Sequence, residues 1–312
     1  MDNCPVFSII IPTYNRADMV GRALESCLRQ DFDDFEVVVV DDGSTDGSEA
    51  VVRSYAESRL RLVRHAENRG VNPARNTGVR AALGEWVVFL DSDDELLPTA
   101  LRTMEDQREK LEQPVGRMAF RYRDDQGRLS PDAWFDTPQV MDYLGYLRWF
   151  DQVRASSDVC NCIRRETFEK VQLPNNRALE ASYFLNFALR YLTAAFPDVV
   201  AMTHSDAPDR YSKPSLRHLA SYASDNAGDL EACLLAHGPA LREWAPRAYW
   251  GLLRAAARNQ FLAGARAKGT AHIVRCLLHE PGSPKMWGMW ALGIMGPSVL
   301  GRAWCRYLSR RG

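Results

Sequence analysis

The almost entirely apolar run from Phe35 to Val40 (FEVVVV) limits the possible folds more than any other feature of the chain. A strand with one face in water alternates apolar and polar side chains, so a run of this kind is typical of a strand that is covered on both faces. Other β-rich runs alternate with helical apolar spacing along the N-terminal part of the chain. The β-rich runs span residues 7–11, 60–64 and 86–90, and the helical patterns span residues 20–28, 48–58 and 72–83. This alternation predicts an α/β fold with a mostly parallel, twisted sheet and helices on both faces.

The pattern changes after residue 115. Residues 118–122, followed by the turn sequence Asp124–Gly127, predict an antiparallel hairpin. Helical spacing is found at residues 168–173 and 179–192, and a further β-rich run is found at residues 199–203. Beyond Pro214 the chain reads as almost wholly helical and is rich in Ala, Leu and Arg. We therefore predict an α/β domain over residues 1–215 and a helical C-terminal extension over residues 216–312.

Charge and cysteine content narrow the class of protein. The formal net charge is -1, so the basic excess of a nucleic-acid-binding surface is missing and no nucleic acid is expected. The 7 cysteines are scattered and odd in number, which does not fit a disulfide framework. The N-terminus has no secretory pattern, and no apolar stretch reaches the roughly 20 residues that span a bilayer. These features predict a reduced, cytoplasmic chain.

Polar sequences follow three of the predicted strands directly. They are Pro12–Arg16, Asp41–Ser48 and Asp91–Glu95. Right-handed crossovers place the carboxyl ends of parallel strands at one edge of the sheet, which is where such sheets bind ligands. We interpret Asp46 and Ser48 as turn and helix-capping residues.

The acidic cluster at Asp91–Glu95 predicts a bound cation. Four carboxylates within five positions repel one another unless a positive charge neutralises them. Oxygen ligands of this kind suit Mg²⁺ or Mn²⁺, which typically bind one or two carboxylates together with substrate phosphates. The sequence therefore predicts a divalent metal site directly after the fourth strand.

Four motifs in succession resemble those of family 2 glycosyltransferases. They are Ser8–Asn15, Val40–Asp46, Asn68–Gly70 with Ala74–Gly78, and Phe89–Asp94. They occur in the order and at the spacing usual in that family, over about residues 6–100, with weaker similarity to about residue 215. The resemblance implies a GT-A-type fold that binds a nucleotide sugar, and an inverting transfer to an acceptor hydroxyl.

The resemblance also implies roles for single residues. Tyr14 would stack on the base of the donor beside the main chain of Pro12, Thr13 and Asn15, and Asp42 would bind the base. Arg75 would reach the base or the phosphates, and Arg210, in the segment Asp209–Ser212, would lie near the phosphates. Asp91, Ser92 and Asp93 resemble the DXD motif, with Asp91 towards the ribose and Asp93 on the metal that bridges the diphosphate. The alternatives are a rim aromatic for Tyr14, a surface helix charge for Arg75, and a structural rather than metal-binding role for His204.

The general base is where the sequence departs from the family pattern. The family commonly has a Glu-Asp pair ahead of a helix that carries an Arg, and the matching stretch here runs from Leu179 to Arg190. Glu180 is present, but Ala181 stands where the Asp would be expected. We take Glu180 as the candidate base; Asp158 as base, or impaired catalysis, remains an alternative. Glu180 also fits a carboxylate that is favoured at a helix start by the macrodipole.

The C-terminal tail has an uneven charge. Residues 281–312 hold five basic residues and no acidic ones, and Met286–Gly301 is uncharged, with Trp287 and Trp290 near its start. As a helix, this uncharged stretch would be about 24 Å long, short of a bilayer core of about 30 Å. Tryptophan with apolar residues followed by arginines resembles an interfacial anchor on an anionic leaflet. We expect residues 281–312 to bind the inner face of the membrane peripherally; a helix docked on the catalytic domain or at a homo-oligomer interface is the alternative.

Other enzyme classes fit poorly. No glycine-rich phosphate turn follows the first strand, as a dehydrogenase needs, and there is no Walker-type sequence. An aspartyl phosphatase would place its DXD after the first strand. The function expected is a metal-dependent transferase that uses Mn²⁺ or Mg²⁺ and a nucleotide-diphosphate sugar, with UDP as the first choice, and that acts on a glycan or lipid-linked acceptor. A non-catalytic nucleotide-sugar binder in a polysaccharide assembly complex is the rival, because of Ala181.

Overall fold

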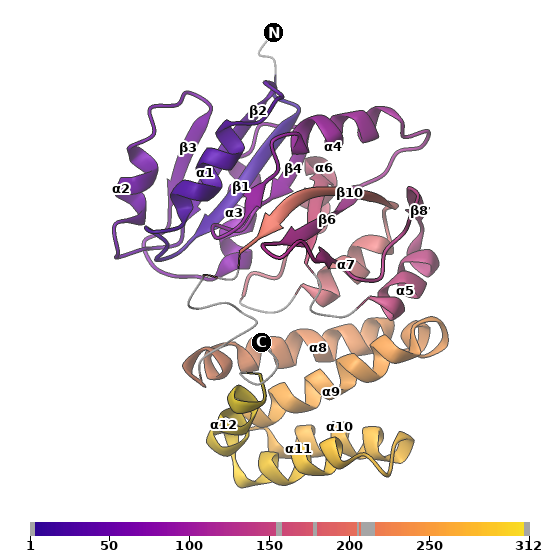
Figure 1. Ribbon diagram of the computed structural model, residues 1–312. Coiled ribbons are helices and arrows are strands. Elements are labelled where there is room, and N and C mark those ends of the chain that lie inside the picture. The colour runs from indigo at the N-terminus through magenta and orange to yellow at the C-terminus, as the bar shows by residue number, and fades with distance from the viewer. Residues whose placement is uncertain (1–3, 154–157, 177–179, 205, 207–215, 309–312) are drawn as a thin grey trace. The chain divides into compact units, whose positions relative to one another are not determined.

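The computed structural model describes residues 4–153, 158–176, 180–204, 206 and 216–308 (Figure 1). The chain forms two compact units, neither of which is continuous in sequence. The first comprises residues 1–146, 157–176 and 186–207, and the second comprises residues 147–156, 177–185 and 208–312. The domain boundary predicted near residue 215 lies outside the described residues and stays a prediction.

The first unit contains one mixed sheet. Its strands are β1 (Phe7–Thr13), β2 (Phe35–Asp41), β3 (Leu60–Arg64), β4 (Trp86–Phe89), β5 (Glu95–Leu96), β6 (Arg117–Asp124), β7 (Leu129–Ser130), β8 (Gln139–Met141), β9 (Val159–Arg164) and β10 (Thr193–Thr203). The strand order is β3-β2-β1-β4-β9-β6-β10-β5, with β7 beside β6 and β8 beside β10. The first four strands in this order are parallel, whereas β9 runs antiparallel to both β4 and β6. The predicted α/β sheet is therefore confirmed.

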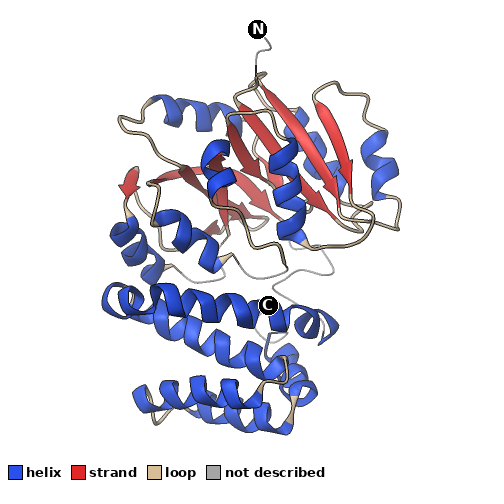
Figure 2. Ribbon diagram, turned by 180° about the vertical axis from the view of Figure 1, so that it is seen from behind, coloured by secondary structure: helices blue, strands red, loops and turns tan. Residues whose placement is uncertain are grey.

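Helices cover both faces of this sheet, as the two opposite views show (Figures 1 and 2). Those wholly in the first unit are α1 (Val20–Leu28), α2 (Ser48–Arg53), α3 (Val71–Ala81), α4 (Ala100–Glu109) and α6 (Arg165–Lys170). Every residue of β1 and β2 is buried, which explains why the apolar run at residues 35–40 needs no alternation. The one charged side chain in that run, Glu36, accepts hydrogen bonds from Ser8 Oγ (2.6 Å) and Arg61 Nε (3.0 Å).

β1 continues two residues past its predicted end, through Pro12 to Thr13. Alternate residues of a parallel strand bond to alternate neighbours: Ile10 O accepts from Leu90 N on the β4 side, and Thr13 O accepts from Asp42 N on the β2 side. The nitrogen of Pro12 therefore faces the β4 side, where β4 has already ended at Phe89. Proline costs the sheet no hydrogen bond there.

The remaining differences from the predicted elements lie at chain turns. The predicted helix at 48–58 ends at Arg53, because Tyr55 N bonds to Val52 O in a tighter turn that brings the Tyr55 hydroxyl 3.3 Å from Gly21 O. The strand predicted at 199–203 begins at Thr193, and its pairing with β6 shifts register around Pro197. The predicted hairpin is confirmed, since β6 pairs antiparallel with β7 and Gln126 N bonds to Asp124 Oδ1 (2.9 Å).

The second unit is helical, as predicted for the C-terminal part. Its helices are α8 (Leu216–Trp244), α9 (Pro246–Leu262), α10 (Arg266–His279), α11 (Pro284–Met295) and α12 (Pro297–Leu308). Parts of α5 (Tyr143–Gln152) and α7 (Ala181–Ala188) belong to this unit. Asp151 of α5 accepts a hydrogen bond from Ala248 N of α9 (2.9 Å), and Ser182 of α7 donates to Asp229 of α8. No described helix is both long and apolar enough to cross a bilayer.

Candidate functional site

The strand ends of the first unit meet at one edge of the sheet. Thr13, Asp41 and Arg64, the last residues of β1, β2 and β3, lie side by side in register. The antiparallel pairing of β9 with β4 and β6 places its start, next to Asp158, at this same edge. The predicted loops therefore share one edge of the sheet, as the sequence analysis expected.

Hydrogen bonds join the loop after β1 to the loop after β2. Asn15 N donates to Ser44 Oγ (2.9 Å), and Thr45 N donates back to Asn15 Oδ1 (2.9 Å). Arg16 N donates to Ser48 Oγ (2.8 Å). Asn15 has φ of 51°, a left-handed conformation that asparagine tolerates better than most residues. Asn15, predicted to line the donor, thus has a clear role in holding the two loops together.

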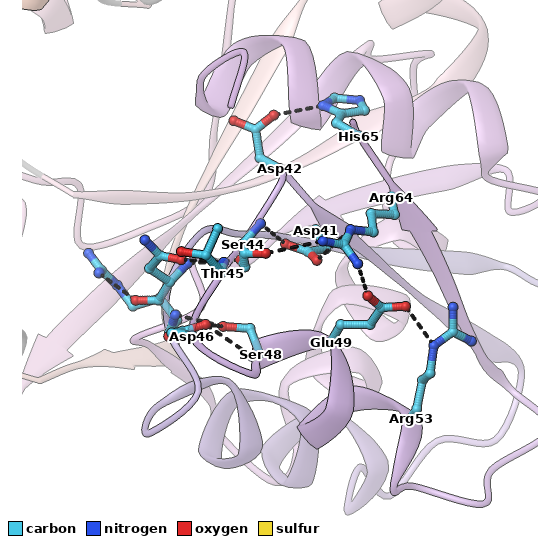
Figure 3. Close-up of polar contacts among 12 residues, drawn as sticks. Asp41, Asp42, Ser44, Thr45, Asp46, Ser48, Glu49, Arg53, Arg64 and His65 are labelled. Atoms are coloured by element: carbon cyan, nitrogen blue, oxygen red, sulfur yellow. Dashed lines mark hydrogen bonds and ion pairs between the residues drawn. The ribbon is translucent and has the colours of Figure 1, made fainter. Parts of the chain in front are cut away.

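Asp46 and Ser48 belong to the same junction (Figure 3). Asp46 Oδ1 accepts from Ser48 N (3.0 Å) and Ser48 Oγ (2.6 Å), while its Oδ2 accepts from Ala17 N (3.0 Å). Burial alone would raise the pKa of Asp46, but the hydrogen bonds from Ala17 and Ser48 outweigh burial and lower it. The predicted turn role is therefore present and extends across to the first loop, whereas the predicted capping role is wrong, since the N-cap of α2 is Gly47, which has no side chain to cap this helix.

The carboxylate of Asp42 is buried and heavily hydrogen-bonded. His65 Nδ1 lies 2.7 Å from Asp42 Oδ1. Figure 3 marks this contact with a dashed line. Arg69 N donates to both carboxylate oxygens (3.0 and 3.1 Å), and Gly70 N donates to Oδ2 (2.7 Å). Asp42 therefore holds the loop that leads into α3. A carboxylate offers about four lone-pair sites. The contacts with His65, Arg69 and Gly70 use both oxygens of Asp42, so little acceptor capacity is left for a base.

Thr13 and Tyr14 stand at the end of β1. The Tyr14 side chain is 42% exposed, so its ring is open to stacking. Thr13 is buried, and its hydroxyl has no hydrogen-bond partner within the part of the chain that the structure describes. A buried hydroxyl without a partner costs free energy that a ligand atom can recover.

Arg75 and Asp91, which the sequence placed in two separate motifs, form an ion pair. Arg75 Nη2 lies 2.7 Å from Asp91 Oδ1, and the guanidinium lies over the Phe89 ring at 5.4 Å. The side chain of Arg75 is only 12% exposed, whereas that of Asp91 is 49% exposed. Arg75 is thus not a surface helix charge. It is held at the end of β4 and gives the carboxylate of Asp91 a fixed direction.

The loop around Asp93 is held from α1. Arg22 Nη2 donates to Asp93 O (2.8 Å), and Arg22 Nη1 donates to Asp206 Oδ2 (2.8 Å). Arg22 Nε also lies 3.6 Å from Glu95, and Glu95 is 2.7 Å from His204 Nε2. The hydrogen bond from Arg22 lowers the pKa of Asp206. One guanidinium therefore ties the Asp91–Glu95 loop to the segment that follows β10.

The donor set suits a divalent cation that is shared with phosphates. Within the described residues, no three His, Cys, Asp or Glu side chains converge closely enough to hold a metal ion by themselves. A metal that bridges a diphosphate needs only one or two protein carboxylates. Asp91 and Asp93 are both partly exposed, while Ser92 and Asp94 between and beside them are buried. Asp91 and Asp93 therefore fit a metal site in which the phosphates of a substrate would supply the remaining ligands.

The two candidate bases lie in different units. Asp158, which is exposed, precedes β9 in the first unit, and its main chain bonds to Ser130 Oγ. Burial raises the pKa of the neighbouring Tyr122 well above its usual value, and the charges of Cys160, Asp94, Asp91 and Asp158 add to this effect. Glu180 directly precedes α7 in the second unit, where its main-chain oxygen accepts from Phe184 N (3.2 Å). Arg210 lies outside the described residues.

The sequence analysis missed two residues of the site. His65 directly follows β3, and the rule applied to the other strand ends would have found it. Arg22 had no such signal, because a single arginine on an amphipathic helix is common. Only the fold brings it to the Asp93 loop.

A family model and a curated relative both match the part of the chain that carries these loops. The model of the family described as glycosyl transferase family 2 matches residues 8–172. The succinoglycan biosynthesis protein ExoO of Rhizobium meliloti (strain 1021) is 44% identical over 104 residues, which are 33% of this chain and 30% of that protein. The chain thus matches less than a third of the length of this relative.

Solved structures share the fold over most of the chain. The S. aureus TarS 1–349 structure in complex with UDP-GlcNAc has a TM-score of 0.59 at 20% identity, covering 88% of this chain and 92% of that one. The mannosyltransferase PcManGT from Pyrobaculum calidifontis, in complex with GDP-Man and Mn²⁺, has a TM-score of 0.54 at 23% identity and covers 99% and 85%. At these identities the likeness confirms the GT-A-type fold, and it says nothing about the ligand of this chain.

Proposed function

This chain belongs to glycosyl transferase family 2, and we propose that it moves a sugar from a nucleoside diphosphate onto an acceptor hydroxyl with the help of Mn²⁺ or Mg²⁺. One observation carries the proposal. Arg75 and Asp91, from two motifs, meet at 2.7 Å at the carboxyl edge of the sheet, next to the partly exposed Asp93. A cation and carboxylates held together at such an edge suit a ligand that carries both phosphates and a sugar.

The donor would lie along the edge from Tyr14 to Asp93. The exposed ring of Tyr14 offers a stacking surface for the base, beside Pro12 and the partnerless hydroxyl of Thr13. Asp42 and Asn15 hold the loops that shape this end of the site. Asp91, Ser92 and Arg75 would contact the ribose and phosphates, and Arg210 is proposed at the phosphates on the resemblance alone. A uridine nucleotide is the first choice.

Asp93 is the proposed metal ligand. A bound divalent cation would stabilise the charge that gathers on the departing nucleoside diphosphate. The main chain of Asp93 is held by Arg22, so its carboxylate stands on a loop of defined position. Rigid support of this kind improves a metal site, because the ligand does not have to be ordered when the metal binds.

Transfer also needs a base to take the proton of the acceptor hydroxyl. The family resemblance favours Glu180, and the sheet register favours Asp158, which directly precedes β9, the strand beside β4. Direct attack by the acceptor, with one of these carboxylates as base, inverts the anomeric centre. Succinoglycan biosynthesis, which the name of the ExoO relative mentions, supports a glycan or a lipid-linked glycan as the acceptor.

A donor screen tests the proposal. Calorimetry with UDP-, GDP- and dTDP-sugars, with and without Mn²⁺, should show association with one nucleotide class that depends on the metal. Replacing Asp93 with Asn should abolish the metal-dependent part, while the exposed Asp106→Asn on α4 should leave it unchanged. Association that is equal in metal buffer and in chelator, or equal for Asp93→Asn, would remove the proposed metal role.

Release of nucleoside diphosphate separates an enzyme from a non-catalytic binder, the rival suggested by Ala181. The wild-type chain should release it slowly to water and faster with acceptor. Glu180→Gln and Asp158→Asn should then differ, because only the true base should lower turnover by about a hundredfold or more while donor affinity is kept. Tight donor binding with no release under any condition would favour the binder.

A further inference from the structure

Two helices of the second unit pack against one aromatic ring of α9. A Cβ atom on Gly269 of α10 would lie 2.7 Å from Phe261 Cδ1, and one on Gly293 of α11 would lie 2.5 Å from Phe261 Cγ. Real Cβ atoms do not approach a ring so closely, so glycine at both positions allows α10 and α11 to lie directly on α9. The faces of α10 and α11 opposite these glycines therefore point away from α9.

These outward faces are apolar. Residues at helical spacing opposite Gly269 and Gly293 form what we call the α10–α11 outer face. Its residues, all exposed, are Ala267, Ala271, Val274 and Leu278 on α10, and Pro284, Trp287, Ala291, Ile294 and Met295 on α11. Lys285 is the only other exposed residue of α11. A helix that only had to face water would carry polar residues at these positions.

The exposure of the large side chains is high. Leu278 is 80% exposed, Met295 59%, Trp287 50%, Val274 46% and Ile294 41%. α10 packs against α11, and large exposed apolar side chains gathered on two packed helices are typical of an interaction site. The Trp287 indole N–H donates to Pro281 O (3.0 Å), which fixes its ring at the start of α11.

Most of the charges around this face are positive. α10 and α11 contain Arg266, Lys268, Arg275 and Lys285 and no acidic residue, although Lys268 Nζ lies 3.2 Å from Glu231 on α8, which compensates its charge. Glu280, between the two helices, lies 3.9 Å from Arg254, so its charge is partly compensated. Exposed Arg302 and Arg306 follow on α12. A partner that matches this face has an anionic surface that covers an apolar layer.

From the exposed apolar face and its basic flanks, we propose that the α10–α11 outer face binds the surface of a membrane that contains anionic lipids. α11 has 12 residues and is about 18 Å long, so it would lie in the membrane plane rather than cross it. The sequence analysis assigned membrane binding to residues 281–312. The structure adds α10 to this surface and makes it a two-helix face rather than a tail.

Vesicle sedimentation of the full-length protein tests this proposal. The protein should sediment with vesicles that contain phosphatidylglycerol and much less with vesicles of phosphatidylcholine alone. Leu278→Asp with Ile294→Asp should lower the vesicle affinity by at least about tenfold, since an aspartate cannot enter the apolar layer. Leu235→Asp is the matched control, because Leu235 is 86% exposed on α8 and does not belong to this face.

The basic flank has its own test. Arg275→Gln and Lys285→Gln should each weaken binding to anionic vesicles by about fivefold, the effect of about 1 kcal/mol for the loss of one charge near an anionic surface. Lys268→Gln should weaken it less, because Lys268 is already paired with Glu231. Brominated lipid should quench tryptophan fluorescence in the wild type and less in Trp287→Phe. Equal sedimentation with both vesicle types, or none, would overturn the proposal. So would a wild-type dimer in solution that Leu278→Asp converts to a monomer without any vesicle binding, because the face would then belong to a second copy of the chain.

Discussion

Arg22 Nη2 and the main-chain oxygen of Asp93 lie 2.8 Å apart, which ties the first helix to the proposed metal loop. The same guanidinium binds Asp206 and lies 3.6 Å from Glu95. Arg22 is therefore a positioning residue, which holds the loop of the proposed metal ligand through the main chain of Asp93.

Replacing Arg22 with Ala should weaken Mn²⁺-dependent donor binding by about tenfold, because the Asp93 loop loses its anchor. Calorimetric titration of Mn²⁺ at saturating UDP measures this. If Arg22 acted only through its charge, its removal would tighten cation binding instead, so the sign decides. Arg29→Ala, at the exposed end of α1, is the control and should leave both the Mn²⁺ affinity and the donor affinity unchanged.

Arg75→Gln should raise the dissociation constant of the donor by about ten- to a hundredfold, as expected for a lost charge-assisted hydrogen bond worth roughly 1.5–3 kcal/mol. Donor calorimetry with Asp91→Asn and the double variant then forms a cycle. Because Arg75 and Asp91 touch, the two effects should not add. The exposed Arg102→Gln on α4 should bind donor like the wild type, and additive losses at Arg75 and Asp91 would contradict a joint role.

His65→Phe should destabilise the first unit by about 1–3 kcal/mol, since the buried Asp42 carboxylate loses a donor. Nε2 of His65 is 2.9 Å from Thr77 Oγ1, so Thr77→Val should show coupling with His65→Phe in urea unfolding. Independent effects of the two changes would mean that the two residues do not act together on Asp42.

Asn15 separates backbone strain from hydrogen bonding. Asn15→Gly keeps a residue that accepts positive φ and loses only the bond from Thr45 N, at a cost of about 1 kcal/mol. Asn15→Ala also forces a left-handed alanine, which costs roughly 1–2 kcal/mol more. Thermal unfolding should therefore rank wild type above Asn15→Gly and Asn15→Gly above Asn15→Ala. A glycine variant less stable than the alanine variant would contradict the strain argument.

Stability should fall as the pH drops below about 6.5, the pKa of an unfolded histidine. Burial lowers the pKa of His237 on α8, and that of His272 on α10, where Glu231 partly opposes the effect. The unfolded chain then binds more protons than the folded chain, so the stability present above pH 6.5 is lost as the pH falls through the lowered pKa. His237→Gln should flatten the dependence of the melting temperature on pH between about pH 7.5 and about pH 5.5, on either side of that pKa. His279→Gln, which changes an exposed histidine, should not.

The sheet edge could be predicted because it depends on chain direction alone. The loops after Thr13, Asp41 and Phe89 follow parallel strands, so they had to meet at one edge whatever side chains packed beneath them. The acidic loop Asp91–Glu95 was placed at this edge for the same reason. The ends of the elements were harder to predict from the sequence. The pairing that continues β1 through Pro12, or that starts β10 at Thr193, depends on where the neighbouring strand begins and ends.

The partners of single side chains were decided by tertiary structure. Whether Asp42 is open to a base or occupied by His65 and two main-chain N–H groups depends on where the loop after β3 folds back, and no spacing in the sequence encodes that distance. Arg22 and Asp93 are 71 positions apart in the chain, and they meet because α1 packs beside β5.

The sequence by itself therefore determined the layered α/β fold, the sheet edge where the predicted site residues meet and the acidic loop, since these follow from periodicity and strand direction. Only the tertiary structure decided which side chains pair at that edge, and that the exposed apolar surface of the second unit is shared by α10 and α11. The physical reason is that apolar periodicity acts along the chain, whereas a hydrogen bond, an ion pair or a shared face depends on distances between segments that packing alone sets.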